Sequence, residues 1–189
     1  MGPIMPLTFR QVSEQEAETY QALILAAYAP TKALGIHFDA ASTTREKTVQ
    51  HLREHGVYGL YDGDLMVASV TLRYPWGPLP GPFGLPHIGW FAAHPDFPGR
   101  QYGKQILQRL EQDVLTDQLR APAVSLGTAT SHPWLKDMYQ KRGFTPAHTA
   151  DLGKGHITLY MTKVLNQTAY QRWLAAQPKA VDAIQQESP

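Results

Sequence analysis

One unit in the middle of the chain constrains the fold most: an apolar strand, a helix and a second apolar strand within residues 87–127. HIGWFAA is typical of a strand, apolar residues recur at helical spacing from about residue 100 to 119, and AVSL after Pro122 is typical of a short buried strand. A helical crossover joins parallel strands. Because hairpin patterns flank this unit, we expect an α/β (α+β) fold with a mixed, mostly antiparallel central sheet flanked by helices.

The flanking segments supply the remaining elements. Ser13 and Glu16 have the spacing of a capping box at the start of the first helix, which Pro30 is expected to end. Gly143 is a typical glycine at a helix C-terminus. The patterns predict a strand at 7–12, helices at about 14–29, 45–54 and 133–142, and strands at 57–61, 65–74, near 144 and at 156–164.

The length of 189 residues suits one domain with a small appendage. We expect the domain at 1–165 and a helix-prone tail at 166–189, which Pro178 interrupts. Trp173 in this tail could cover the core or form a homodimer contact, and the sequence leaves both roles open.

Charge and composition limit the partners. The net charge of +1 predicts no basic face for nucleic acid. The absence of cysteine removes thiolate metal ligands and a cysteine nucleophile. No apolar run approaches the ~18 residues of a membrane span, and the N-terminus lacks the pattern of a signal peptide. We therefore expect a cytoplasmic protein with no metal, membrane or nucleic-acid partner.

The stretch HPDFPGRQYGKQIL joins the central strand to its helix. A helix N-terminus presents free N–H groups and a positive dipole end to anions, and glycine lets a phosphate approach the backbone. Arg100 and Lys104 add positive charge beside Gly99 and Gly103. The alternative is an ordinary turn in which Gly103 packs the helix on the sheet. The Walker and dinucleotide-binding patterns are both absent.

A second motif, MYQKRGF, follows some forty residues later. Together the two motifs, in this order within residues 88–144, resemble the GCN5-related N-acetyltransferase (GNAT) family. In that family a turn of pattern R/Q-x-x-G-x-G/A opens the helix after the central strand. Gly103 matches its last position, whereas Pro98 and Gln101 depart from its first position and its middle glycine.

The resemblance implies the GNAT acyl-CoA N-acyltransferase fold and acetyl-CoA, or another acyl-CoA, as donor. The donor's pyrophosphate is expected on backbone N–H groups of the turn, and its pantetheine arm along the central strand as an added strand. Tyr139 is expected to act as general acid toward the leaving thiolate. The implied donor-binding residues are Phe91, Ala92, Ala93, Arg100, Gln101, Tyr102, Gly103, Lys104 and His132, which stands where the family often has asparagine.

The sequence gives less information about the residues that bind the acceptor. Direct transfer needs a base for the attacking amine, and His87 is our candidate, with His132 and His37 as alternatives. The stretch PWGPLPGPFGLP, rich in proline and glycine, is either a rigid surface loop or a wall of the acceptor pocket. The acceptor residues proposed on this basis are Tyr28, His37, Trp76, Phe83 and Trp90, a partly apolar set.

The resemblance thus predicts an enzyme that acetylates a primary amine of an unidentified acceptor. A small molecule is favoured, and an exposed protein amine is the alternative. A non-catalytic acyl-CoA-binding or sensing module on the same fold is the alternative, because a fold does not determine an activity. Tyr139 favours the enzyme, whereas Pro98 and Gln101 leave room for the sensor. A nucleotide-binding protein of another type is disfavoured, since its phosphate-binding patterns are absent.

Overall fold

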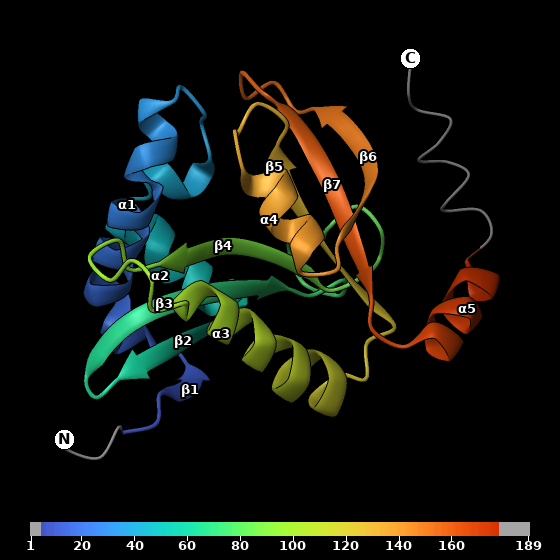
Figure 1. Cartoon of the computed structure of the whole chain (residues 1–189), viewed down its shortest axis with the longest axis horizontal. Coiled ribbons are helices and arrows are strands. Elements are labelled where there is room, and N and C mark those ends of the chain that lie inside the picture. The colour runs from blue at the N-terminus through green and yellow to red at the C-terminus, as the bar shows by residue number, and fades with distance from the viewer. Residues whose placement is uncertain (1–4, 178–189) are drawn as a thin grey trace.

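The computed structural model describes residues 5–177, which contain a seven-stranded sheet in the order β1-β2-β3-β4-β5-β7-β6 (Figure 1). Only β4 and β5 pair in parallel, and the remaining neighbours are antiparallel. The mixed, mostly antiparallel sheet is therefore confirmed. The strands are β1 (Thr8–Gln11), β2 (Gly56–Asp62), β3 (Leu65–Arg73), β4 (His87–Ala93), β5 (Ala123–Ala129), β6 (Thr145–Asp151) and β7 (Ile157–Val164).

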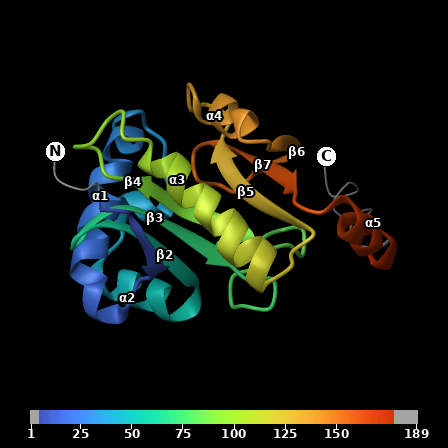
Figure 2. The ribbon, with the colours of Figure 1, turned by 60° about the horizontal axis from the view of Figure 1, so that its bottom comes forward.

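Helices cover both faces of the sheet (Figure 2). The helices α1 (Ala17–Ala33) and α2 (Arg45–Glu54) lie on one face, which we call the α1 face. The helix α3 (Tyr102–Arg109), continued by the π-helical segment η3 (Leu110–Gln118), lies on the other, the α3 face. The predicted crossover between β4 and β5 is this continuous helical segment.

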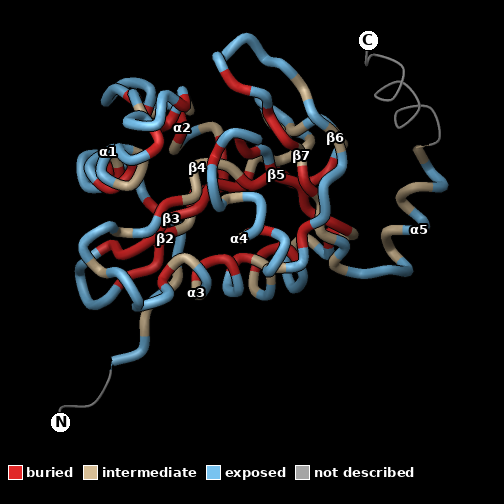
Figure 3. The backbone as a smooth tube through the Cα atoms, turned by 45° about the horizontal axis from the view of Figure 1, so that its top comes forward, coloured by how far each residue is buried: buried red, intermediate tan, exposed pale blue. Residues whose placement is uncertain are grey.

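Alternation along β3 explains the two layers, because successive side chains of a strand point to opposite faces. Thr71 contacts both helices of the α1 face, with its hydroxyl 3.4 Å from Tyr20 Oη and 2.7 Å from His51 Nε2. Its neighbour Val70 belongs to the core cluster that contains Ile106 of α3. Figure 3 shows buried backbone concentrated in the central strands and along the sheet-facing side of α3.

The predicted end of the first helix is wrong. The helix α1 continues past Pro30 to Ala33. Proline lacks only its own N–H, so within the last turn it removes a single intrahelical hydrogen bond. The Leu34 N–H closes the helix by donating to the carbonyls of Pro30 and Thr31, at 3.3 and 3.1 Å.

The parallel pair β4–β5 splits soon after it begins (Figure 1). Its paired positions are His87 with Ser125 and Ile88 with Leu126. From Gly89 onward the β5-facing edge of β4 has no paired strand among the described residues. The strands then diverge, which leaves an opening through the sheet.

A β-bulge lies on the free part of β4. Thr71 pairs with Gly89 and Ser69 pairs with Ala92, so β4 carries one more residue than β3 across this interval. Trp90 takes a φ of +42°, a conformation unusual for a bulky residue. Bulges bend a strand and redirect its backbone groups, and this one lies beside the opening.

The C-terminal helix α5 (Gln167–Ala176) lies apart from the sheet and contains no buried residue (Figure 1). It falls within the tail predicted at 166–189, whose residues from 178 lie outside the described part. None of the helices described within residues 5–177 is long and apolar enough to span a bilayer.

Candidate active site

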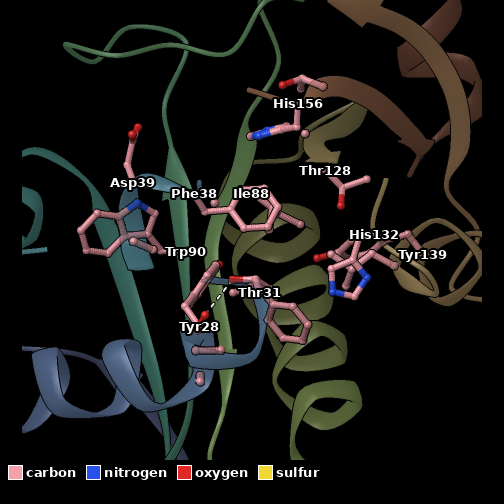
Figure 4. A pocket seen from close by; sticks show the side chains of 18 of the residues that line it. Tyr28, Thr31, Phe38, Asp39, Ile88, Trp90, Thr128, His132, Tyr139 and His156 are labelled. Atoms are coloured by element: carbon pink, nitrogen blue, oxygen red, sulfur yellow. Dashed lines mark hydrogen bonds between the residues drawn. The ribbon is translucent and has the colours of Figure 1, made fainter. Parts of the chain in front are cut away.

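A cavity of about 450 Å³ occupies the opening between β4 and β5 (Figure 4). It is lined from both faces, by the end of α1, η2 (Asp39–Ser42), β4, β5, α4 (Leu135–Lys141), the β6–β7 turn and β7. Side chains from opposite faces of the sheet can therefore reach one ligand. In Figure 4, Tyr139 and His132 lie on one side of the cavity and Asp39 and Trp90 on the other, with Tyr28 between.

Tyr139 is a buried cavity residue of α4. Its ring packs near Phe91 and Phe144, with ring centroids 6.4 and 5.9 Å away. Burial raises the pKa of Tyr139 well above 10, against a smaller opposing effect of Arg142. The hydroxyl is therefore protonated at neutral pH and is available to donate to a ligand in the cavity.

Tyr28 lines the same cavity from the end of α1. Burial raises its pKa well above the usual value, the neighbouring hydroxyl of Tyr139 adds to the rise, and the Phe91 backbone opposes it. The ring is partly exposed to solvent through the cavity mouth. Two neutral phenols and the backbone of the bulge thus meet at the centre of the opening.

The turn before α3 matches the requirements of an anion site. Gln101 is the N-cap of α3 and takes a left-handed φ of +57°, which explains why the family pattern has glycine there. The first intrahelical bond runs from Gln105 N–H to Gln101 C=O, at 3.0 Å. The N–H groups of Tyr102, Gly103 and Lys104 are therefore left without intrahelical partners.

Gly103 also brings this helix end close to the free strand. A Cβ built on Gly103 would lie 2.9 Å from Phe91 Cζ and 3.8 Å from Ala93 Cβ. The packing role and the anion role that the sequence left as alternatives are therefore compatible at this position. Arg100 is exposed beside the same turn.

His87 lies at the point where β4 and β5 separate. Its Nδ1 is 2.8 Å from Ser125 Oγ, so a side-chain hydrogen bond joins the two strands at the first of their two paired positions. Burial, reinforced by Arg73, lowers the pKa of His87 to about 3. A histidine with this pKa is a poor proton acceptor, so the geometry favours a structural role over that of a base.

Two further histidines line the cavity. His132 is buried, and its Nδ1 accepts the Trp134 N–H at 3.4 Å in the turn before α4. That turn displaces the predicted helix start from residue 133 to Leu135. His156 lies after the β6–β7 turn, and its buried Nδ1 has no hydrogen-bond partner among residues 5–177. Burial is the main cause that lowers the pKa of both histidines.

Three residues predicted for the acceptor pocket lie outside the cavity. Trp76 is exposed and stacks on Tyr74, with ring centroids 5.0 Å apart. Phe83 packs against Tyr160, and His37 is exposed near the β6–β7 turn. The Pro/Gly stretch therefore does not place its aromatic side chains in the cavity wall.

The Pro/Gly stretch instead folds over the start of β4, where Gly81 packs directly on His87. Among the predicted acceptor residues, Tyr28 and Trp90 do line the cavity. Trp90 stacks on His51 of α2 with ring centroids 3.7 Å apart, which stabilises its unusual backbone conformation.

The sequence did not indicate the polar residues of the cavity on the α1 face. Arg73 lines it from the end of β3, and Asp39 and Lys154 form an ion pair of 2.9 Å at its rim. Tyr160 contributes a hydroxyl group. Thr128 adds another from the α3 face, since it pairs with Leu159 of the core that contains Ile106. The only sequence feature that could have identified one of them is the arginine that ends the otherwise apolar strand LMVASVTLR.

The split sheet, the free strand edge and the glycine turn define a class of protein. Residues 19–144 match the family described as "Acetyltransferase (GNAT) family", and the chain belongs to it. It is therefore an acyltransferase, and the family uses acetyl-CoA. Membership favours the enzyme over the non-catalytic binding module.

Two N-acetyltransferases are similar to this chain over most of its length. An S-(2-succino)cysteine N-acetyltransferase of Bacillus subtilis (strain 168) is 45% identical over 157 residues, which are 83% of this chain and 95% of the relative. An S-alkylcysteine N-acetyltransferase of the same organism is 30% identical over 171 residues, 90% of this chain and 96% of the relative.

A solved structure shows the same fold. The Paia N-acetyltransferase of Thermoplasma acidophilum, in complex with coenzyme A, superposes with a TM-score of 0.65 at 17% identity. The match covers 85% of this chain and 99% of that one.

Proposed function

We propose that the protein transfers an acetyl group from acetyl-CoA to the amine of an S-substituted cysteine. The observation that carries this proposal is a single cavity in which the free edge of β4 and Tyr139 lie together with a cationic side chain, Arg73. A small acceptor that carries negative charge fits such a cavity. The two relatives, which the chain matches over nearly their whole lengths, support S-substituted cysteine as the acceptor class.

The residues present fit acetyl-CoA. The unpaired edge of β4 from Gly89 to Ala93 can hydrogen-bond an extended pantetheine arm as an added strand. The free N–H groups of Tyr102, Gly103 and Lys104 can bind its pyrophosphate, and Arg100 and Lys104 add charge. A side chain at Gly103 would fill the space beside Phe91.

Acetyl-CoA supplies the reactive thioester, and the chain supplies orientation and protons. Backbone N–H groups of the bulge near Phe91 provide donors for negative charge on the acyl oxygen. The neutral hydroxyl of Tyr139 donates to the departing sulfur. His156 is a better candidate than His87 for accepting the amine proton, because its ring lies on the acceptor side with an unpaired Nδ1.

The test is acetylation of a substrate panel. Purified protein, acetyl-CoA and S-(2-succino)cysteine, S-methylcysteine, a polyamine or a peptide amine are incubated, and thiol release and product mass are measured. We expect an N-acetylated product from an S-substituted cysteine and much slower turnover of the other amines. Thermal stabilisation by CoA without acetylation of any S-substituted cysteine would overturn the proposed acceptor.

A further inference from the structure

The charge balance of the cavity contains an uncompensated cation. The acidic, lysine and arginine residues that line it are Asp39, Arg73 and Lys154. Asp39 and Lys154 pair with each other at 2.9 Å. Arg73 forms no ion pair with a carboxylate of residues 5–177, and its one hydrogen bond is a long contact of 3.4 Å from Nη2 to the Pro80 carbonyl. One positive charge therefore remains for a ligand.

The guanidinium of Arg73 is also incompletely hydrogen-bonded. Its Nε is buried and has no partner among the described residues. Buried polar groups in folded proteins are normally paired, and unpaired ones need an explanation. An arginine presents a planar set of donors that matches a carboxylate. A ligand carboxylate would satisfy both the charge and the unpaired donor.

The groups around Arg73 do not replace such a ligand. His51, His55 and His87 lie close to it, and burial is the largest cause that lowers the pKa of each. They are therefore neutral at pH 7. Asp39 and Tyr160 act on Arg73 in the opposite sense, but desolvation outweighs them and lowers the pKa of Arg73.

The position of Arg73 indicates which part of an acceptor it meets. Arg73 pairs with His87, and Phe91 lies in the bulge opposite the interval between Ser69 and Thr71 of β3. The levels of Arg73 and Phe91 are therefore about three β3 residues apart, roughly 10 Å at ~3.3 Å per residue. The arginine side chain shortens this interval by extending over Gly89, where a Cβ would lie 4.0 Å from Arg73 Cδ. When the α-amine of an amino acid reacts beside Phe91, its α-carboxylate also lies near Phe91. Only a group farther out on the side chain of that amino acid can then reach Arg73.

We propose that Arg73 binds a carboxylate on the S-substituent of the acceptor, beyond the sulfur, and selects an anionic S-substituted cysteine over an S-alkylcysteine. This inference rests on the proposed function. S-(2-succino)cysteine carries such carboxylates on its S-substituent and S-methylcysteine carries none. Removal of one partner of a desolvated charge pair leaves the other partner buried and unpaired, so the difference should be measurable in kcat/KM.

The experiment compares Arg73→Gln and Arg73→Lys with wild type on S-(2-succino)cysteine and S-methylcysteine. For Arg73→Gln we expect kcat/KM to fall about 30-fold or more on the succinyl substrate and less than about 3-fold on the methyl substrate. Arg73→Lys should recover part of the loss, because it keeps the charge but not the planar donor set. The KM for acetyl-CoA should not change.

The other outcomes separate the two proposals. Equal losses on both acceptors, or no loss on either, would overturn the role of Arg73 and leave the proposed function intact. Failure of wild type to acetylate either acceptor would overturn the proposed function itself.

A matched pair of acceptors tests the inference without any variant. S-(2-carboxyethyl)cysteine and S-propylcysteine differ in the terminal group of the S-substituent, a carboxylate in one and a methyl in the other. We expect wild type to prefer the acid about 10-fold or more, in line with the strength of charged hydrogen bonds. An equal or reversed preference would contradict the inference even if Arg73→Gln fails to fold.

Discussion

The two sides of the cavity are built in different ways. The proposed donor side consists of backbone groups of β4 and of the turn before α3, with Tyr139 from the nearby motif. The proposed acceptor side consists of side chains from β3, η2 and the β6–β7 turn, segments that are far apart in the sequence. A function shared by a family can therefore be encoded in short motifs, whereas selectivity depends on long-range contacts.

This contrast makes a general prediction about mutations. Changes on the donor side should affect all acceptors alike, since every acceptor uses the same acyl donor. Changes on the acceptor side should alter the preference among acceptors while the KM for acetyl-CoA is unchanged.

Tyr139→Phe should give the largest loss. The substitution removes the hydroxyl but keeps the ring that packs near Phe91 and Phe144. We expect kcat to fall about 10²-fold or more on every acceptor, because general acid catalysis typically contributes that much. Initial-rate kinetics with two acceptors provide the measurement.

Tyr170→Phe in α5 is the matched control, because it removes a tyrosine hydroxyl at a position outside the cavity. It should behave as wild type. A Tyr139→Phe enzyme with unchanged kcat would show that the tyrosine serves packing alone.

The α1 face should make stability depend on pH. Burial is the main cause that lowers the pKa of His51 and His87 to about 3, from 6.5. The unfolded chain therefore binds more protons between about pH 6.5 and 3. Stability is fully present above pH 6.5 and is lost as the pH falls, by up to ~1.4 kcal/mol per pH unit for each histidine. Urea unfolding at pH 7.5 and pH 5 measures this loss.

Replacement of one histidine identifies the source. His51→Gln should reduce the difference in stability between pH 7.5 and pH 5, whereas His37→Gln, at an exposed position, should not. If the pH dependence were the same in all three proteins, His51 would not be its origin.

The fold was predictable because its determinants are local. The apolar run HIGWFAA, the apolar stripe after residue 100 and the glycine after MYQKR each specify an element from adjacent residues. The error at Pro30 has a physical cause: a proline removes one hydrogen bond and crowds the preceding turn, and α1 accommodates both effects close to its end.

The site was predictable only in part. Gly103 and Tyr139 belong to motifs, so their positions followed from spacing. Arg73 and His156 enter the cavity because β3 and β7 flank the split pair, a fact of sheet order that no local pattern contains. The bulge at Trp90 depends on a stacking partner in α2, and Gly89 within a strand was the only indication of it.

Gly103→Ala should give a moderate loss confined to the donor side. The new Cβ would lie 2.9 Å from Phe91 Cζ, so either the ring or the start of α3 must move. Overpacking of this kind costs about 1–3 kcal/mol, and we expect the KM for acetyl-CoA to rise about 10-fold. The preference between acceptors should not change.

A double variant tests the cause of that loss. Adding Phe91→Leu to Gly103→Ala removes the ring that the new methyl group meets. Recovery of acetyl-CoA binding, measured as non-additivity of the two changes, would support the steric explanation. If the effects of the two substitutions on acetyl-CoA binding simply added, the loss in Gly103→Ala would arise elsewhere in the turn and not from contact with Phe91.

Lys154→Gln should give the smallest effect. It distinguishes attraction of the acceptor by the total positive charge of the cavity from specific hydrogen bonding at Arg73. Lys154 is paired with Asp39, and their side chains are 39% and 72% exposed. Exposed ion pairs contribute only about 0–1 kcal/mol, so kcat/KM on S-(2-succino)cysteine should fall less than about 3-fold. A loss as large as that expected for Arg73→Gln would mean that the summed positive charge of the cavity attracts the acceptor. A small loss would mean that hydrogen bonding at Arg73 provides the selectivity, because one cation is already neutralised and the other is not.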